Sequence, residues 1–195
     1  MQIKHTSLRH AALALGAIVL AGFLTGCMSA DARKMHEEAQ DRNERSQVSA
    51  EDLNVPIPAN HPLFDAIAVG RVKYKEASPG KNDDDILRSR LALALMNVKY
   101  FALQKEDARY IADAVILEAV NSGIFSTKAK TVVEYTLRET SGGTVVYRKT
   151  LIGTASESGS SMTAPMKDSY VRWNALRETV LQFLSDITVA VSSSP

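Results

Sequence analysis

The sequence predicts an α/β domain of the α+β type, in which two helices pack on one face of a four-stranded, mainly antiparallel sheet in the order β-α-β-β-β-α. Three observations support this fold. Residues 131–138 and 144–152 alternate between apolar and polar side chains on either side of a glycine turn at 141–143, which is the pattern of an antiparallel hairpin. Two apolar stripes with helical spacing run through 87–101 and 173–191. The composition, 45% hydrophobic and 23% charged in 195 residues, is that of one globular domain of modest size.

The first strand is expected at 66–74, where the parity of the apolar residues changes at Gly70 and so indicates a β-bulge. The acids of Asn82–Asp85 suit a helix N-terminus. The helix that follows is expected to have about 18 residues, with its apolar stripe running from Leu87 to Phe101.

Residues 109–120 are ambiguous, because their apolar side chains also fit a helical stripe that ends at Gly123, and periodicity alone does not decide. The polar stretch 154–163 is expected to be a mobile loop before the last helix. The side chains of that helix available to face water are Arg172, Arg177, Glu178 and Asp186.

The N-terminus, residues 1–26, has the layout of a secretory signal peptide. A basic start is followed by an apolar run at 11–24, which is shorter than the roughly 20 residues of a spanning helix. The run ends in Leu24, Thr25, Gly26 and Cys27, the only cysteine of the chain. This sequence resembles the lipobox of bacterial lipoproteins, which implies that Cys27 becomes the first mature residue and carries acyl chains. The alternative is a cysteine that falls by chance at the end of a secretory signal.

The residue after the cysteine bears on the membrane in which such a protein would lie. In Gram-negative lipoproteins an aspartate there tends to retain the protein in the inner membrane, and here the position is Met28. The resemblance therefore implies the periplasmic face of the outer membrane. The formal charge of the chain is +1, which gives no field of one sign to gather nucleic acid.

Residues 27–62 are expected to form the lipidated N-terminus and a flexible charged tether, and 63–195 the periplasmic domain. The tether carries charges of both signs and few large apolar residues, so it cannot bury enough surface to fold alone. Fully extended, its roughly 35 residues would reach on the order of 100 Å.

Three short stretches point to a known group. Tyr110–Ala114, Val133–Leu137 and Arg172–Leu184 match a Tyr-x-x-x-Ala strand, a Val-x-Tyr-x-Leu strand and a last helix after a polar loop. With the element order behind a lipobox, the chain is similar to small lipoproteins of Gram-negative bacteria, among them uncharacterised ones, the lipopolysaccharide-assembly lipoprotein and the auxiliary lipoproteins of ABC-type transport. The likeness covers about 66–187 and favours a strand at 109–120.

Catalytic residues do not form a recognisable set. After processing, His36 and His61 are the only histidines; they belong to no spaced ligand set and are expected to be solvated. The serine-rich run 156–161 lacks a nucleophile elbow. Helix capping explains the acids 83–85 better than a cation site, because EF-hand spacing is missing. We therefore expect no enzyme activity, no metal and no cofactor.

Tyr170, Arg172 and Trp173 are the candidate partner-binding residues, because Tyr, Trp and Arg dominate interface energies and these three start the last helix after a polar loop. The alternative for Trp173 is packing on the sheet. An unpaired sheet edge offers a second mode of binding.

These features predict a non-catalytic outer-membrane lipoprotein that presents a binding domain to a protein partner of the cell envelope. The alternative is a carrier of a lipid or other apolar ligand between helices and sheet.

Overall fold

The computed structural model describes residues 47–53, 55–58, 60–76, 83–122, 126–158 and 164–192. These residues belong to one compact unit, Ser46–Pro195. The predicted signal peptide, the lipobox residues Leu24, Thr25, Gly26 and Cys27, and His36 lie outside them. Among the described residues, no helix combines the length and apolar character needed to cross a membrane.

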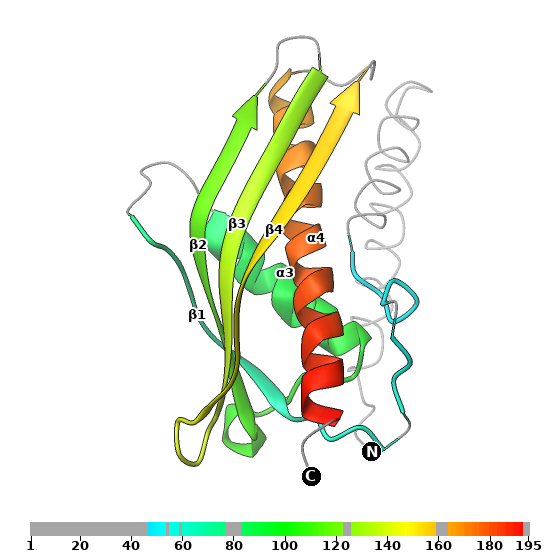
Figure 1. The fold of residues 1–195 in the computed structure, drawn as a ribbon, viewed down its shortest axis with the longest axis vertical. Coiled ribbons are helices and arrows are strands. Elements are labelled where there is room, and N and C mark those ends of the chain that lie inside the picture. Colours follow the sequence, from blue (N-terminus) through cyan, green and yellow to red (C-terminus); the bar gives the residue numbers. More distant parts are fainter. Residues whose placement is uncertain are drawn as a thin grey trace, which may run out of the picture. The chain divides into compact units, whose positions relative to one another are not determined.

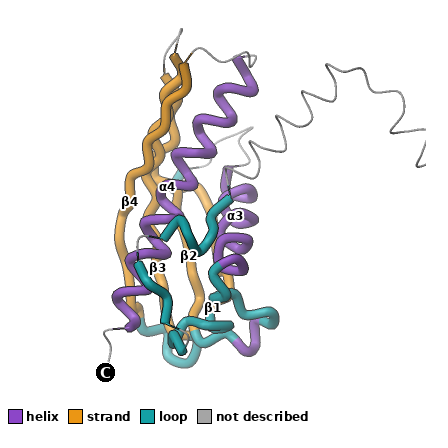
Figure 2. Tube along the Cα trace, turned by 90° about the vertical axis from the view of Figure 1, so that its right-hand side faces the viewer, coloured by secondary structure: helices purple, strands orange, loops and turns teal. Residues whose placement is uncertain are grey.

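The elements follow the order that the sequence predicts (Figure 1). They are β1 (Ile67–Tyr74), α3 (Asp83–Asn97), the short 3-10 helix η1 (Lys105–Asp107), β2 (Tyr110–Ser122), β3 (Ser126–Glu139), β4 (Val145–Ser158) and α4 (Ala164–Ser192). The strands form one sheet in the order β1-β2-β3-β4, in which β1 runs parallel to β2 and the other neighbours are antiparallel. Both helices lie on the same face of the sheet (Figure 2). The predicted fold class is therefore confirmed.

The ambiguous segment is the inner strand β2. Its Ala112 pairs with Val69 of β1 on one side and with Leu137 of β3 on the other. An inner strand carries apolar residues on both of its faces, and the adjacent Ile111 and Ala112 are both buried. Apolar residues of both parities imitate a helical stripe, which is why the periodicity did not separate the two structures.

The bulge and the hairpin also agree with the sequence. The register of β1 against β2 shifts between Val69 and Val72, around Gly70. The turn between β3 and β4 contains Gly143 at a φ of 68°, a conformation that glycine adopts at little cost.

Two predicted boundaries are wrong. Residues 154–158 of the expected mobile loop belong to β4, where Thr154 pairs with Lys130 and Ser156 with Lys128. The polar side chains there suit a strand because the end of the sheet is exposed to water on one face. Helix α3 is shorter than expected and ends at Asn97, so that Phe101 instead forms a bridge to Ile67.

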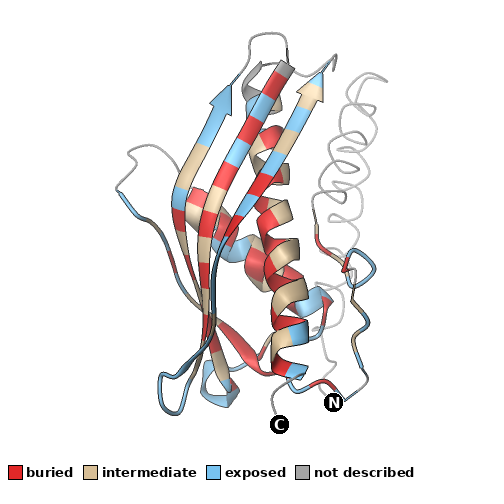
Figure 3. Ribbon diagram, viewed as in Figure 1, coloured by how far each residue is buried: buried red, intermediate tan, exposed pale blue. Residues whose placement is uncertain are grey.

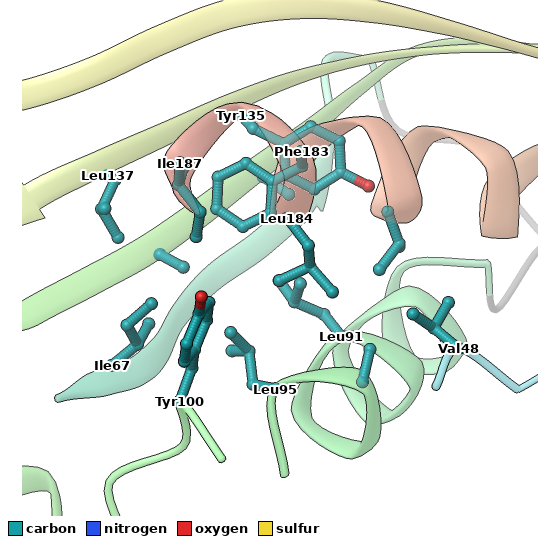
Figure 4. Close-up of a cluster of buried hydrophobic side chains, with 14 of the residues drawn as sticks. Val48, Ile67, Leu91, Leu95, Tyr100, Tyr135, Leu137, Phe183, Leu184 and Ile187 are labelled. Carbon is teal, nitrogen blue, oxygen red and sulfur yellow. The ribbon is translucent and has the colours of Figure 1, made fainter. Parts of the chain in front are cut away.

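The core lies between the sheet and the two helices (Figures 3 and 4). Tyr135 of β3 stacks on Phe183 of α4 with ring centroids 4.7 Å apart, and its hydroxyl is 2.9 Å from Thr179 Oγ1. Burial, opposed by the Thr179 hydrogen bond, raises the pKa of Tyr135 above its ordinary value. Helix α4 crosses β4 so closely that a Cβ atom added at Gly153 would lie 1.9 Å from the carbonyl oxygen of Ala175.

An N-terminal segment, residues 47–62, packs onto this core. Val48 and Leu53 are buried in the same cluster as side chains of α3 and α4. Figure 4 shows Val48 beside Leu91 of α3. In Figure 2 the segment, drawn as a loop, lies over the two helices. The compact unit therefore begins before residue 63, and it includes residues that the sequence analysis assigned to the tether.

Candidate functional site

The N-terminal segment is attached to both helices by polar contacts. Arg177 of α4 donates through Nε to the carbonyl oxygen of Gln47 at 2.9 Å, and its Nη2 lies 2.8 Å from Oδ2 of Asp52. Asn97 at the end of α3 donates to the carbonyl oxygen of Val48 at 2.7 Å. These contacts fix the chain where it enters the domain.

The carboxylate of Asp52 is held in its ionised form. Burial raises the pKa of Asp52, but the hydrogen bonds from the Ser49 backbone N–H and from the Arg177 guanidinium outweigh it, so that the pKa lies below its ordinary value. The ionised state therefore stabilises the attachment of the N-terminal segment.

We expect this attachment to weaken in acid. Because the pKa of Asp52 is lower in the folded protein than in the unfolded chain, the stabilisation is present at neutral pH and is lost as the pH falls below about 4. Hydrogen exchange of the Leu53 amide, which donates to the carbonyl oxygen of Ala50, reports it. The Asp52→Asn variant is the control, since its exchange should already be faster at neutral pH. An identical acid response in that variant would contradict the assignment to Asp52.

Trp173, a candidate partner-binding residue, is half-buried on the side of α4 that faces α3. The guanidinium carbon of Arg90 lies 5.5 Å from its ring centroid. Its ring lines a crevice with Val48 and Leu87 whose volume, about 10 Å³, is no larger than a single water molecule needs. The surface around Trp173 is therefore shared with the N-terminal segment, and its role in binding a partner stays a prediction.

The other two candidates also make contacts within the chain. Arg172 Nε lies 3.3 Å from Oδ1 of Asp83, and the hydroxyl of Tyr74 donates to the same carboxylate. Burial, reinforced by this hydrogen bond to Asp83, raises the pKa of Tyr74 above its ordinary value. The half-buried Tyr170 packs near Ala129 and Ala175. Asp83 thus connects β1, α3 and α4, a role beyond the capping that the sequence suggested.

The other polar residues of α4 that were expected to face water bind neighbouring elements. Asp186 accepts hydrogen bonds from Tyr147 at 2.8 Å and Lys149 at 2.9 Å. Burial and then this carboxylate raise the pKa of Tyr147 above its ordinary value. Glu178 accepts the backbone N–H of Thr154 at 2.6 Å. These residues are therefore partly exposed, as expected, but they also bind neighbouring elements.

The sheet edges are β1 and β4. In the middle of β4, side chains of α4 form hydrogen bonds with backbone groups that a further strand would need for pairing. Gln182 donates to the carbonyl oxygen of Ile152 at 3.1 Å, and Glu178 accepts the backbone N–H of Thr154. Pairing of a partner strand along all of β4 would require these side chains to move.

His61 is buried, so the expectation of a solvated histidine is wrong. Its Nδ1 accepts the backbone N–H of Leu63 at 3.1 Å, which leaves the proton on Nε2. Nε2 lies 3.0 Å from the carbonyl oxygen of Thr188 and 2.7 Å from Oγ of Ser192. No local pattern could have indicated these contacts, because the partners are more than 120 residues away.

The His61–Ser192 contact has the distance of a catalytic dyad but not its polarity. A general base needs an unprotonated nitrogen facing the serine hydroxyl. Here Nε2 carries the proton, and the Ser192 hydroxyl donates to the carbonyl oxygen of Thr188 at 2.7 Å. The pair therefore ties the N-terminal segment to the end of α4 and is not arranged to activate the serine.

No known sequence family and no curated protein matches this chain. Solved structures do match: a candidate lipoprotein from Caulobacter crescentus CB15 aligns with a TM-score of 0.50 at 13% identity, covering 67% of this chain and 93% of its own. The chain shares its fold with this candidate lipoprotein. A protein of family DUF330 from Xanthomonas campestris aligns with a TM-score of 0.52 at 13% identity, covering 71% and 92% of the two chains.

A hypothetical protein from Chlamydia trachomatis gives a TM-score of 0.52 at 12% identity, covering 67% of this chain and 99% of its own. At such identities the likeness establishes a shared fold and no more. The similarity to uncharacterised lipoproteins is thereby supported, whereas the finer likeness to the lipopolysaccharide-assembly lipoprotein stays a prediction.

Proposed function

We propose that this chain is a non-catalytic lipoprotein, anchored to the periplasmic face of the outer membrane, that presents its domain to a protein partner of the cell envelope. The observation that carries the proposal is the stretch Leu24–Cys27 at the end of a signal-peptide layout. The fold shared with a candidate lipoprotein supports it.

The chemistry of the anchor follows from the residue types. The thiol of Cys27 is the nucleophile that a diacylglyceryl group alkylates, and the small residues Thr25 and Gly26 allow a peptidase to approach the bond to be cut. Stable anchoring requires more than one acyl chain, which the thioether and the new amino terminus of Cys27 together provide. Fixing the domain to the membrane raises its effective concentration near membrane partners without any new contact.

Cys27→Ala is expected to abolish acylation and to remove the protein from the outer-membrane fraction. The described domain begins some 20 residues later, so it should fold as before. The measurements are mass spectrometry of the N-terminal peptide, membrane fractionation and circular dichroism of the purified domain. Normal outer-membrane fractionation of a folded Cys27→Ala protein would contradict the proposal.

A second variant tests the choice of membrane. Met28→Asp should leave acylation intact and move the protein to the inner-membrane fraction, while the matched control Met28→Ala stays in the outer membrane. An unmodified Cys27 in these variants would refute the anchor itself. If both variants were acylated and both lay in the inner membrane, only the outer-membrane location would be refuted.

The carrier alternative gains no support from the described residues. The side chains that fill the space between helices and sheet, such as Tyr135, Phe183 and Leu184, are fully buried against one another. The crevice beside Trp173 has room for one water molecule and not for an acyl chain. A partner of the folded surface therefore fits the structure better than a ligand in its interior.

A further inference from the structure

Apolar side chains gather at the end of α3, beside Asn97, which binds the N-terminal segment. They line a shallow, open hollow together with two charged residues; the six are Phe64, Asp65, Met96, Lys99, Phe101 and Leu103. Leu103 is 85% exposed, the highest value among the large apolar residues described, and Met96, which lines the same hollow, is 51% exposed. We name the four apolar residues of this set the end patch.

The backbone around the end patch is held in a costly conformation. Asp65 and Lys99, at φ values of 49° and 62°, are the non-glycine residues with positive φ in the described part, and both line the hollow. Lys99 occupies the position after α3 at which glycine is preferred. The N–H of Lys99 donates to the carbonyl oxygen of Met96, and the N–H of Tyr100 donates to the carbonyl oxygen of Leu95. The Asp65 N–H donates to the carbonyl oxygen of Lys99 at 3.0 Å. Strained residues of this kind cluster at functional sites, and a glycine at either position would avoid the strain.

Among the residues that line the hollow, the charges are balanced. Lys99 and Asp65 are both exposed and contribute one cation and one carboxylate. A zwitterionic phospholipid headgroup has the complementary pair, a phosphate for the lysine and an ammonium for the aspartate. An anionic surface would instead select a basic rim without an acid.

The anchor proposed above keeps such a surface within reach. At most about 60 Å of chain separates Cys27 from the start of the compact unit at Ser46, even when that stretch is fully extended. Apolar side chains that protrude from a folded domain beside a bilayer gain free energy by entering the boundary between headgroups and acyl chains.

We infer that the end patch rests on the zwitterionic phospholipid surface of the membrane, with Leu103 and Met96 inserted at the headgroup level. This inference rests on the proposed anchoring through Cys27. It gives the tethered domain a preferred orientation, in which the end of α3 faces the bilayer and the far end of the sheet points away from it.

The test uses the full acylated chain in vesicles of phosphatidylethanolamine and phosphatidylcholine that contain a headgroup-level nitroxide lipid. Leu103→Cys supplies a thiol for a bimane label. Ile152→Cys, 52% exposed on the sheet face opposite the helices, is the matched control with the same label. The expected result is quenching about threefold stronger at 103 than at 152, little changed by salt or by added anionic lipid.

A second substitution removes the contact without touching the label. Met96→Asp in the Leu103→Cys protein should lower the quenching to that of the Ile152→Cys control, whereas Val120→Asp, at a residue of similar exposure elsewhere, should not. Equal quenching at 103 and 152, or no effect of Met96→Asp, would overturn the inference and leave the end patch to a protein partner.

The same preparation separates this outcome from failure of the proposed function. If Cys27 is acylated, each chain takes up one label, because Cys27 is the only native cysteine. Two labels per chain would show that the anchor is missing and would refute the proposed function.

Discussion

Gly153→Ala is expected to lower the free energy of unfolding by about 3 kcal/mol, a large effect for one added methyl group. The new Cβ would meet the carbonyl oxygen of Ala175 at 1.9 Å and its carbonyl carbon at 2.9 Å. Both atoms belong to the backbone of α4, so no side-chain rotation relieves the overlap. Helix α4 would have to move away from β4 and open the core on which it packs.

Urea denaturation followed by circular dichroism measures this effect. Gly142→Ala in the turn between β3 and β4 is the control, because the added Cβ there meets only Thr144 Oγ1 at 3.6 Å. Its stability should change by less than about 1 kcal/mol. Equal stabilities of the two variants would mean that α4 does not lie so close to β4.

Asp83→Ala is expected to cost about 3 kcal/mol of stability, because it breaks an ion pair whose carboxylate is buried. The Asp83 side chain is 3% exposed, and its loss leaves Arg172, at 25% exposed, without this partner. It also removes the acceptor of the Tyr74 hydroxyl. The contact between β1, α3 and α4 at this point would be lost with it.

Asp85→Ala is the matched control, since Asp85 lies in the same first turn of α3 but is exposed. Its cost should stay within about 1 kcal/mol, the size of a favourable interaction with the helix dipole. The double variant Asp83→Ala/Arg172→Ala should be less destabilised than the sum of the two single variants. Strict additivity would show that the two side chains do not interact.

The strand pattern of this domain could be predicted because pairing leaves a local mark. The alternation of Val133, Tyr135 and Leu137 against polar neighbours follows directly from a sheet with one covered face. The parity change at Gly70 likewise belongs to β1 alone. Such patterns can be recognised without knowing which elements pack against the strand.

The features that escaped prediction depend on residues far apart in the chain. Val48 and Leu53 are ordinary apolar residues in a charged stretch, and they are buried only because they join the core cluster to which α3 and α4 contribute. Asp83 was expected only to cap a helix. Its ion-pair partner Arg172 lies 89 positions further along the chain, so no local pattern connects the two residues. Polar edge residues such as Thr154 and Ser156 form a strand because β3 is long enough to pair with them. Tertiary contacts of this kind override local propensity.

The docked N-terminal segment sets how far the domain can travel from its proposed anchor. A tether free up to residue 62 would extend to on the order of 100 Å, whereas the stretch Met28–Ser46 reaches about 60 Å at most. The bilayer area that the domain can reach from a fixed anchor grows with the square of the tether length. Shortening the tether from about 100 Å to about 60 Å therefore lowers this area to about a third. If the proposed anchor and partner exist, the contacts of Arg177 and Asn97 with the segment confine the search for that partner to a small neighbourhood of each anchor. Two such proteins would share a partner only when their anchors diffuse close together in the plane of the membrane.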